Sequence, residues 1–225
     1  MIAAIHQPDY FPYLGYFFKI YESDLFLFLD DVPYSNNGFT NWNRIKGPQG
    51  ELRLKIPVIQ TLGDPINRVR TRDELKWKEK HLKTIYLNYK KAEYFEEVYP
   101  DLEGLILEKY ETISQMNMEI IRFLLKKFHF TQTLETSSSF GITSKKEQRV
   151  MDLCKRAGAD IYISGNGARA YQSEEHFQKN GIELKYTQYR PYVYPQLWGD
   201  FIENLSVIDY LFHCGYHWPE DGSGR

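Results

Sequence analysis

Two short apolar segments near the N-terminus constrain the fold more than any other feature of this chain. Residues 25–29 are five consecutive apolar residues, and Asp30 and Asp31 end the run. A strand without apolar–polar alternation is buried on both faces, which is typical of a parallel sheet. This run is preceded by a shorter apolar run at 2–5, a turn, and a helix-compatible segment at 13–21. The first 30 residues therefore predict a strand, a loop, a helix and a second strand parallel to the first.

The rest of the chain continues this α/β pattern around a helical stretch. Hydrophobic periodicity predicts three helices between residues 73 and 128, and later strands at 132–136, 160–164 and 182–186. We predict an α/β fold with a mostly parallel open sheet, Rossmann-like, in which residues 1–72 and 129–225 form the core domain. Residues 73–128 are then a helical insertion or subdomain.

Several local features of the core are also predicted. Residues 33–50, rich in Asn, Gly, Pro and Trp, predict a long functional loop, and 52–58 alternate like a half-exposed strand. Thr143 or Ser144 is expected to cap a helix running to residue 156, with Glu147 completing a capping box if Ser144 is the cap. Ser173 is expected to cap a helix to residue 179, and residues 205–212 predict a final helix.

Composition excludes several functional classes. The chain has 225 residues, with 28 Lys and Arg against 30 Asp and Glu, so its formal charge of -2 argues against a nucleic-acid-binding protein. Two cysteines cannot build a disulfide framework. The start has no signal-peptide pattern, and no apolar run is long enough to span a membrane. We expect a cytoplasmic protein.

The loop after the first strand contains the first group of candidate site residues. Ligands of open α/β sheets bind beyond the carboxyl ends of strands, and His6 lies at such an end. We therefore predict His6 as a catalytic base, with Gln7 and Tyr10 in substrate binding. Asp31 follows the second strand, where a carboxylate could act in catalysis or hold Mg²⁺. Ordinary turn and capping roles are the alternatives for these residues.

Polar loops farther along the chain provide the remaining candidates. Residues 39–47 combine amides, cations and Trp, so we predict that Asn43, Arg44 and Lys46 recognise a nucleotide or nucleotide-sugar. A solvated turn with one buried Trp is the alternative. Further substrate-binding candidates are Lys146 at a helix N-terminus, Ser164 and Asn166 after a strand, and Tyr189 and Tyr194 in an aromatic–proline segment.

Parallel topology predicts that the polar candidates converge on one cleft, with the two tyrosines as a wall. The sequence contains neither a Walker A motif nor a complete dinucleotide-binding fingerprint. The cluster His213, Cys214 and His217 offers metal ligands, but it is isolated and we predict no metal site. We expect the tail, residues 220–225, to be disordered.

The motifs quoted above carry a family resemblance. The opening His6-Gln7-Pro8-x-Tyr10-x-Pro12-x-x-Gly15-Tyr16-Phe17-x-Lys19-Ile20 resembles the signature of the WbqC-like protein family. The resemblance continues through 43–46, Trp77, His81, 144–146, 158–165 and 201–209, and so covers nearly the whole chain. It implies a context of bacterial surface-polysaccharide and nucleotide-sugar genes.

A weaker resemblance exists at fold level. A His after the first strand and a later Ser-Lys turn resemble the HUP-like superfamily of adenylate-forming and nucleotidyl-transferring enzymes. ATP with Mg²⁺ is therefore a candidate cofactor. The superfamily usually has a second His in its first motif, and here Leu14-Gly15-Tyr16 stands in its place.

The family context and the residues together give two hypotheses for function. The first is an enzyme that transfers an acyl or aminoacyl group, such as glycyl, to the amine of a nucleotide-linked amino sugar for surface polysaccharide. Its partners would be the nucleotide-sugar and the acyl or amino-acid donor, and the protein could be an oligomer. The second is a non-catalytic nucleotide-sugar binding or assembly protein.

Overall fold

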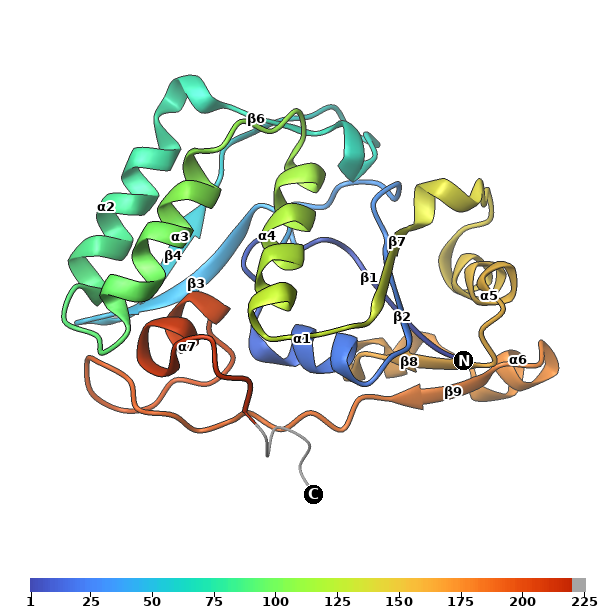
Figure 1. Ribbon diagram of the computed structural model, residues 1–225. Helices are drawn as coiled ribbons and strands as arrows, with labels where there is room; N and C mark the ends of the chain where they lie inside the picture. The colour runs from blue at the N-terminus through green and yellow to red at the C-terminus, as the bar shows by residue number, and fades with distance from the viewer. Residues whose placement is uncertain (220–225) are drawn as a thin grey trace.

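A sheet of five parallel strands forms the centre of the structure, a computed structural model that describes residues 1–219 (Figure 1). The strands follow the order β7-β2-β1-β8-β9 across the sheet. They are β1 (Ile2–His6), β2 (Leu25–Phe28), β7 (Thr133–Thr136), β8 (Ile161–Ser164) and β9 (Glu183–Tyr186). This arrangement confirms the predicted α/β fold with a mostly parallel sheet.

The predicted pair of N-terminal strands lies at the centre of this sheet. β1 and β2 run parallel, with Ala3 opposite Leu25 and His6 opposite Phe28. All four residues of β2 are buried, as the unbroken apolar run predicts. Alternate side chains of the two strands enter different apolar clusters: one holds Ala4, Phe26 and Phe28, and the other Ala3, Ile5, Leu25 and Leu27.

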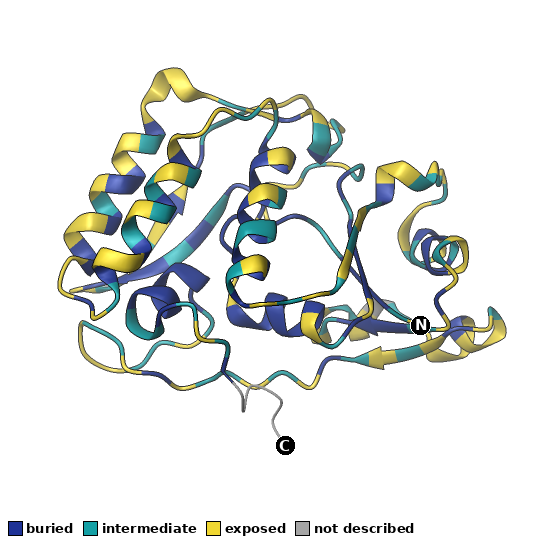
Figure 2. Cartoon of the chain, in the orientation of Figure 1, coloured by how far each residue is buried: buried dark blue, intermediate teal, exposed yellow. Residues whose placement is uncertain are grey.

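Residues 1–219 also form seven α-helices. They are α1 (Leu14–Tyr21), α2 (Trp77–Tyr89), α3 (Phe95–Leu107), α4 (Ile113–Lys127), α5 (Lys146–Ala157), α6 (Glu174–Lys179) and α7 (Val207–Cys214). Helices α2, α3 and α4 correspond to the three predicted helices. Figure 2 shows buried and exposed stripes on α2 to α4, whereas α1 and α7 are buried almost all round.

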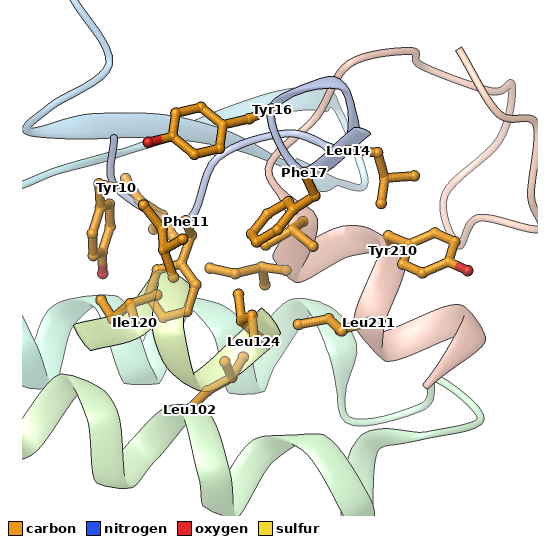
Figure 3. Close-up of a cluster of buried hydrophobic side chains, with 14 of the residues drawn as sticks. Tyr10, Phe11, Leu14, Tyr16, Phe17, Leu102, Ile120, Leu124, Tyr210 and Leu211 are labelled. Carbon is orange, nitrogen blue, oxygen red and sulfur yellow. The ribbon is translucent and has the colours of Figure 1, made fainter. Parts of the chain in front are cut away.

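The helices of residues 73–128 share an apolar cluster with the opening loop and α1. Leu102, Ile120 and Leu124 belong to the same cluster as Phe11 and Phe17 (Figure 3). The rings of Phe17 and Phe128 meet edge to face at a centroid distance of 5.6 Å. The helical segment thus contributes directly to the core beside the sheet. Its status as a separate insertion or subdomain stays a prediction.

A β-hairpin replaces part of the predicted long loop. β3 (Trp42–Gly47) pairs antiparallel with β4 (Gly50–Lys55), so the prediction of a loop over 33–50 is wrong for its second half. Asn and Lys disfavour strands by propensity, but the burial of Asn43 and Ile45 in β3 offsets that preference. A second small pair, β5 (Val58–Ile59) and β6 (Arg70–Thr71), follows.

Two capping predictions have different outcomes. Ser173 caps α6 by accepting a hydrogen bond from the backbone N–H of His176, as predicted. The proposed cap of α5 is wrong, because the helix begins after Lys145 and the Ser144 hydroxyl instead donates to Asp152. Glu147 accordingly forms no capping box but binds the α6 N-terminus.

None of the helices in residues 1–219 combines the length and apolar character needed to cross a bilayer. The predicted disorder of residues 220–225 lies outside the described residues.

Candidate functional site

A cleft opens where the strand order of the sheet reverses. β1 connects to β2 on one side, whereas β8 on its other side is reached by the connection from β7, and this reversal creates a crevice at the carboxyl ends of β1 and β8. The cleft has a volume of about 540 Å³, within the size range of small-molecule sites. Its walls come from the segments that follow four strands: His6 and Gln7, Leu29, Ser164 to Ala168, and Thr187 with Tyr189.

His6 stands at the end of β1 with its ring facing the cleft. Its Nδ1 lies 3.1 Å from the Gln7 carbonyl oxygen and 3.6 Å from Asp9 Oδ2. Since a carbonyl only accepts, the short contact places a proton on Nδ1 and leaves Nε2 as the acceptor. Desolvation, followed by the charge of Lys19, lowers the pKa of His6 to about 3. His6 is therefore neutral at pH 7.

Asp9 and Lys19 form a buried pair of opposite charge beside His6, and both line the cleft. Asp9 is 5% exposed and Lys19 is 4% exposed. The Lys19 ammonium donates to the Ile5 carbonyl at the end of β1 across 3.1 Å. Burial raises the pKa of Asp9 to about 7 and lowers the pKa of Lys19 to about 7, while each charge partly offsets the effect on the other.

Two titratable groups with pKa values near neutrality in a cleft are typical of a functional site. Neither residue was among the candidates predicted from the sequence. One signal was available for Lys19, because a lysine interrupts an otherwise apolar and aromatic helix. Asp9 occupies an unspecified position of the opening motif, so no sequence signal marked it.

The turn after β8 contributes polar groups to the opposite wall. Ser164 is 1% exposed, and its carbonyl accepts a hydrogen bond from the Thr187 N–H at 2.9 Å. Asn166 donates from its side-chain amide to the Thr187 carbonyl at 3.1 Å. These bonds hold the segments after β8 and β9 together, so this wall is well defined before a ligand binds.

A smaller cavity of about 250 Å³ adjoins the cleft. The two cavities share Asp9, Tyr13 and Phe39, and the smaller one also contacts Asn43 and Arg44. Tyr13 and Phe39 are 38% and 40% exposed, so flat aromatic surfaces stand at the junction. With Asp9 at the same junction, the arrangement provides room for two bound groups on either side of one carboxyl.

Asn43 and Arg44 lie at this smaller cavity but also have structural partners. Asn43 donates to the carbonyls of Tyr10 and Phe11 and accepts from the Arg44 N–H, so it fixes the opening loop. The Arg44 guanidinium forms an ion pair with Glu51 at 2.8 Å. Arg44 is thus available to an anion only in competition with Glu51.

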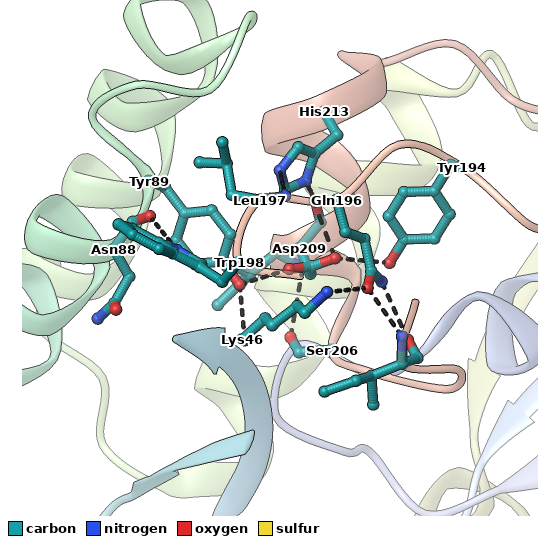
Figure 4. A network of polar contacts seen from close by, with 12 residues as sticks. Lys46, Asn88, Tyr89, Tyr194, Gln196, Leu197, Trp198, Ser206, Asp209 and His213 are labelled. Atoms are coloured by element: carbon teal, nitrogen blue, oxygen red, sulfur yellow. Dashed lines mark hydrogen bonds and ion pairs between the residues drawn. The ribbon is translucent and has the colours of Figure 1, made fainter. Parts of the chain in front are cut away.

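Lys46 and Tyr194 do not lie at the cleft, because both belong to a buried network around Asp209 (Figure 4). The Lys46 ammonium donates to Gln196 Oε1 at 3.1 Å, to the Gly199 carbonyl at 3.2 Å and to the Asp200 carbonyl. Tyr194 donates to Asp209 at 2.9 Å.

A lysine that is 1% exposed and bound to three oxygens cannot reach a ligand in the cleft. The prediction that Lys46 shares the cleft with the other polar candidates is therefore wrong. So is the placement of Tyr194 in its wall, and only Tyr189 of the two tyrosines lines the cleft.

Three further candidates also lie away from the cleft lining. The hydroxyl of Tyr10, which is fully buried, meets His81 Nδ1 at 3.1 Å. Lys146, at the exposed start of α5, does not line the cleft. Asp31 instead pairs with the Arg149 guanidinium at 2.5 Å.

The adjacent carboxylates at the end of β2 do not fit a Mg²⁺ site. The Arg149 guanidinium occupies the place of a cation beside Asp31. Asp30 accepts hydrogen bonds from Asn67, Ser137 and Ser138. These bonds show that the pair anchors the segment after β7 to β2.

The suspected metal ligands near the C-terminus are engaged in the fold. His213 Nε2 accepts from the Leu197 N–H at 2.9 Å, so Nδ1 carries the proton and donates to the Asp209 carbonyl at 2.7 Å. Across residues 1–219, no group of three or more His, Cys, Asp or Glu side chains is arranged to hold a metal ion.

The strand order, the two apolar faces and the crevice define an α/β protein of the doubly wound kind with a cleft at its switch point. More specifically, the chain belongs to the WbqC-like protein family, whose model matches residues 7–220. This confirms the resemblance found in the sequence. The Mycobacterium tuberculosis protein Rv1507c, described as uncharacterized, is 32% identical over 222 residues, covering 97% of this chain and 96% of that protein. No solved structure matches the chain.

Proposed function

We propose that this protein is a cytoplasmic enzyme that transfers an acyl or aminoacyl group, such as glycyl, to the amine of a nucleotide-linked amino sugar used in surface polysaccharide. The observation that supports it best is the two-part cleft with buried Asp9 at the junction. One cavity accommodates the nucleotide-sugar and the adjoining cavity a small acyl group. The aromatic surfaces of Tyr13, Phe39 and Tyr189 suit stacking on a base or sugar ring.

The chemistry requires removal of a proton from the attacking amine. The sugar nitrogen attacks the carbonyl carbon of an activated acyl donor, the N–C bond forms, and the donor's leaving group departs with the bonding electrons. The nitrogen gives up its proton to a base whose pKa should lie near the working pH. Asp9, with a pKa of about 7, fits this role better than His6, with a pKa of about 3.

The neighbouring groups have complementary roles in this proposal. Neutral His6 presents Nε2 as a hydrogen-bond acceptor that orients the amine. The Lys19 ammonium stabilises negative charge on the phosphates or on the reacting carbonyl oxygen. Lys46 and Lys146 have no part in phosphate binding, because neither lines the cavities.

Thermal-shift measurements with nucleotide-sugars test the binding part of the proposal. A ligand that binds only the folded protein raises its melting temperature by mass action, by an amount that grows with concentration. We expect nucleotide-linked amino sugars to raise it more than the free nucleotides do. The absence of any shift at millimolar concentration would contradict the proposal.

Two substitutions then separate an enzyme from a non-catalytic binder. Asp9→Asn should abolish acyl transfer to the sugar amine while changing nucleotide-sugar affinity little, and Asp200→Asn, an exposed carboxylate, serves as the control. A wild-type protein that binds the nucleotide-sugar but transfers no acyl group from any activated donor would favour the binding or assembly role. Full turnover by Asp9→Asn would exclude Asp9 as the base.

A further inference from the structure

A second hollow lies apart from the cleft, between the β4–β5 segment and the start of α2. Its volume is about 620 Å³, which also falls in the range of small-molecule sites. Lys55, Arg72 and Lys80 lie on its walls, and Pro57, Ile59 and Leu75 provide its accessible apolar surfaces. We call this hollow the basic groove. None of the residues that line the cleft or its adjoining cavity lines the basic groove.

The charges on the basic groove are of one sign. No Asp or Glu is among its lining residues. Lys55, Arg72 and Lys80 are exposed and have no ion-pair partner within 4 Å in the described part of the chain. The nearby Asp73 carboxylate accepts from the Trp77 indole at 2.8 Å and pairs with Lys78. The positive potential of the groove is therefore not cancelled locally.

The same asymmetry appears along the sequence. Residues 53–83 contain nine Lys or Arg against four Asp or Glu, a net charge of +5, although the whole chain has a net charge of -2. A local excess of cations in a concave surface concentrates anions there. The basic groove is thus the part of this acidic protein best suited to an anionic ligand.

An uncharged histidine, His81, forms the floor of the groove. The Nε2–H of His81 donates to the Lys55 carbonyl at 3.2 Å, so Nδ1 accepts from the Tyr10 hydroxyl. Burial lowers the pKa of His81 to about 4, so this residue adds no charge at pH 7. The charge of the groove therefore comes from Lys55, Arg72 and Lys80.

We propose that the basic groove binds a small organic phosphate, with the phosphates on the three cations and the organic part against Pro57, Ile59 and Leu75. Size and composition favour this class: an isolated phosphate would leave most of 620 Å³ empty, and a neutral ligand would not use the cations. This site is independent of the acyl-transfer reaction proposed above.

Residue-resolved lysine acetylation tests the proposal without an activity assay. The full-length protein is treated with an amine-reactive acetylating reagent, with and without uridine diphosphate, pyrophosphate or uridine, and modification is quantified by mass spectrometry. Lys55 and Lys80 report on the groove, and exposed Lys91 is the internal control. We expect uridine diphosphate to protect both reporters at lower concentration than pyrophosphate, uridine to protect neither, and Lys91 to be unaffected.

Arg72→Gln provides the matched variant because it retains both reporter lysines. Loss of one cation from a charge-assisted phosphate site should raise the concentration of uridine diphosphate that gives half-protection about tenfold. Arg156→Gln, which removes an exposed cation from α5, should leave it unchanged. Asp9→Asn should also leave it unchanged, because Asp9 lies in the cleft.

Three outcomes would overturn the proposal. The first is that neither uridine diphosphate nor pyrophosphate changes the modification of Lys55 or Lys80 at 10 mM, which is roughly the weakest affinity of interest for such a ligand. The second is equal loss of protection in Arg72→Gln and Arg156→Gln, which would indicate an effect of net charge alone. The third is protection by a single-stranded RNA oligonucleotide but by neither small phosphate, which would assign the groove to nucleic acid.

Discussion

Burial of charge is the feature at residue scale that separates the cleft from the rest of the molecule. Asp9 and Lys19 are almost wholly removed from solvent, yet no salt bridge within 4 Å joins them in residues 1–219. Each ionised form is therefore disfavoured by desolvation, and their pKa values approach one another near 7. Lys46 is equally buried but has three oxygen acceptors, and this difference separates a reactive group from a structural one.

The shifted pKa of Lys19 predicts a pH dependence of stability. Between pH 7 and 10.5 the unfolded chain holds a proton on Lys19 that the folded chain has lost, so stability rises with pH in this window by up to about 1.4 kcal/mol per pH unit. Lys19→Met removes this rise. Urea unfolding from pH 5 to 10 should show the wild type gaining stability relative to the variant as the pH rises above 7. Parallel curves for the two proteins would contradict the shift.

Lys46→Met tests the structural role of Lys46. The substitution removes the donor of the Gly199 and Asp200 carbonyls and leaves Gln196 Oε1 with only the Ile202 N–H, which should lower the free energy of unfolding by about 2–4 kcal/mol. Exposed Lys145→Met should change it by less than about 0.5 kcal/mol. Urea denaturation measures both. A variant with normal stability that no longer binds the nucleotide-sugar would instead indicate that Lys46 contacts the ligand.

At the scale of elements, the first turn of α1 determines the shape of the cleft wall. Gly15 is packed so closely that a Cβ there would lie 2.3 Å from Tyr13 Cε2 and 2.7 Å from Tyr189 Cδ1. Tyr13 and Tyr189 meet edge to face at 5.8 Å over this glycine. Both rings line the cleft, so α1 and the segment after β9 form one wall together.

Gly15→Ala should displace both tyrosine rings and thereby weaken ligand binding about tenfold. Gly104→Ala is the matched control, because α3 leaves open space at that position. There the added methyl should stabilise the protein by about 0.5–1 kcal/mol and leave binding unchanged. Isothermal calorimetry with a nucleotide-sugar measures the affinity, and thermal unfolding measures the stability. Equal affinity of Gly15→Ala and wild type would argue against this wall as a ligand contact.

At the scale of the whole molecule, apolar packing joins the sheet to the helices of residues 73–128. Phe26 and Phe28 of β2 share one cluster with Leu102 of α3 and Ile120 of α4. The C-terminal helix α7 enters the same cluster through Phe212, which is fully buried. Figure 3 shows this convergence of segments from both ends of the sequence.

Such packing predicts that the whole chain unfolds in one cooperative transition. Removing the helical segment from the cluster would expose β2, so neither part should persist without the other. Far-ultraviolet circular dichroism and tryptophan fluorescence should give coincident urea curves. Two separated transitions would instead support an independent subdomain at 73–128.

The sequence by itself determined the parallel sheet, because unbroken apolar runs such as β2 and the loop–helix–strand order are local patterns. It also placed His6, Gln7, Ser164 and Asn166 at strand ends, from which topology brings them to one cleft. Only the tertiary structure decided which cations face that cleft. Lys19 and Lys46 are both lysines in partly apolar surroundings, and distant carbonyls at 199 and 200 bind one of them and not the other. Hydrogen bonds between residues 153 and 154 positions apart leave no periodic trace in a sequence. Burial strengthens such bonds, because the local dielectric constant is low.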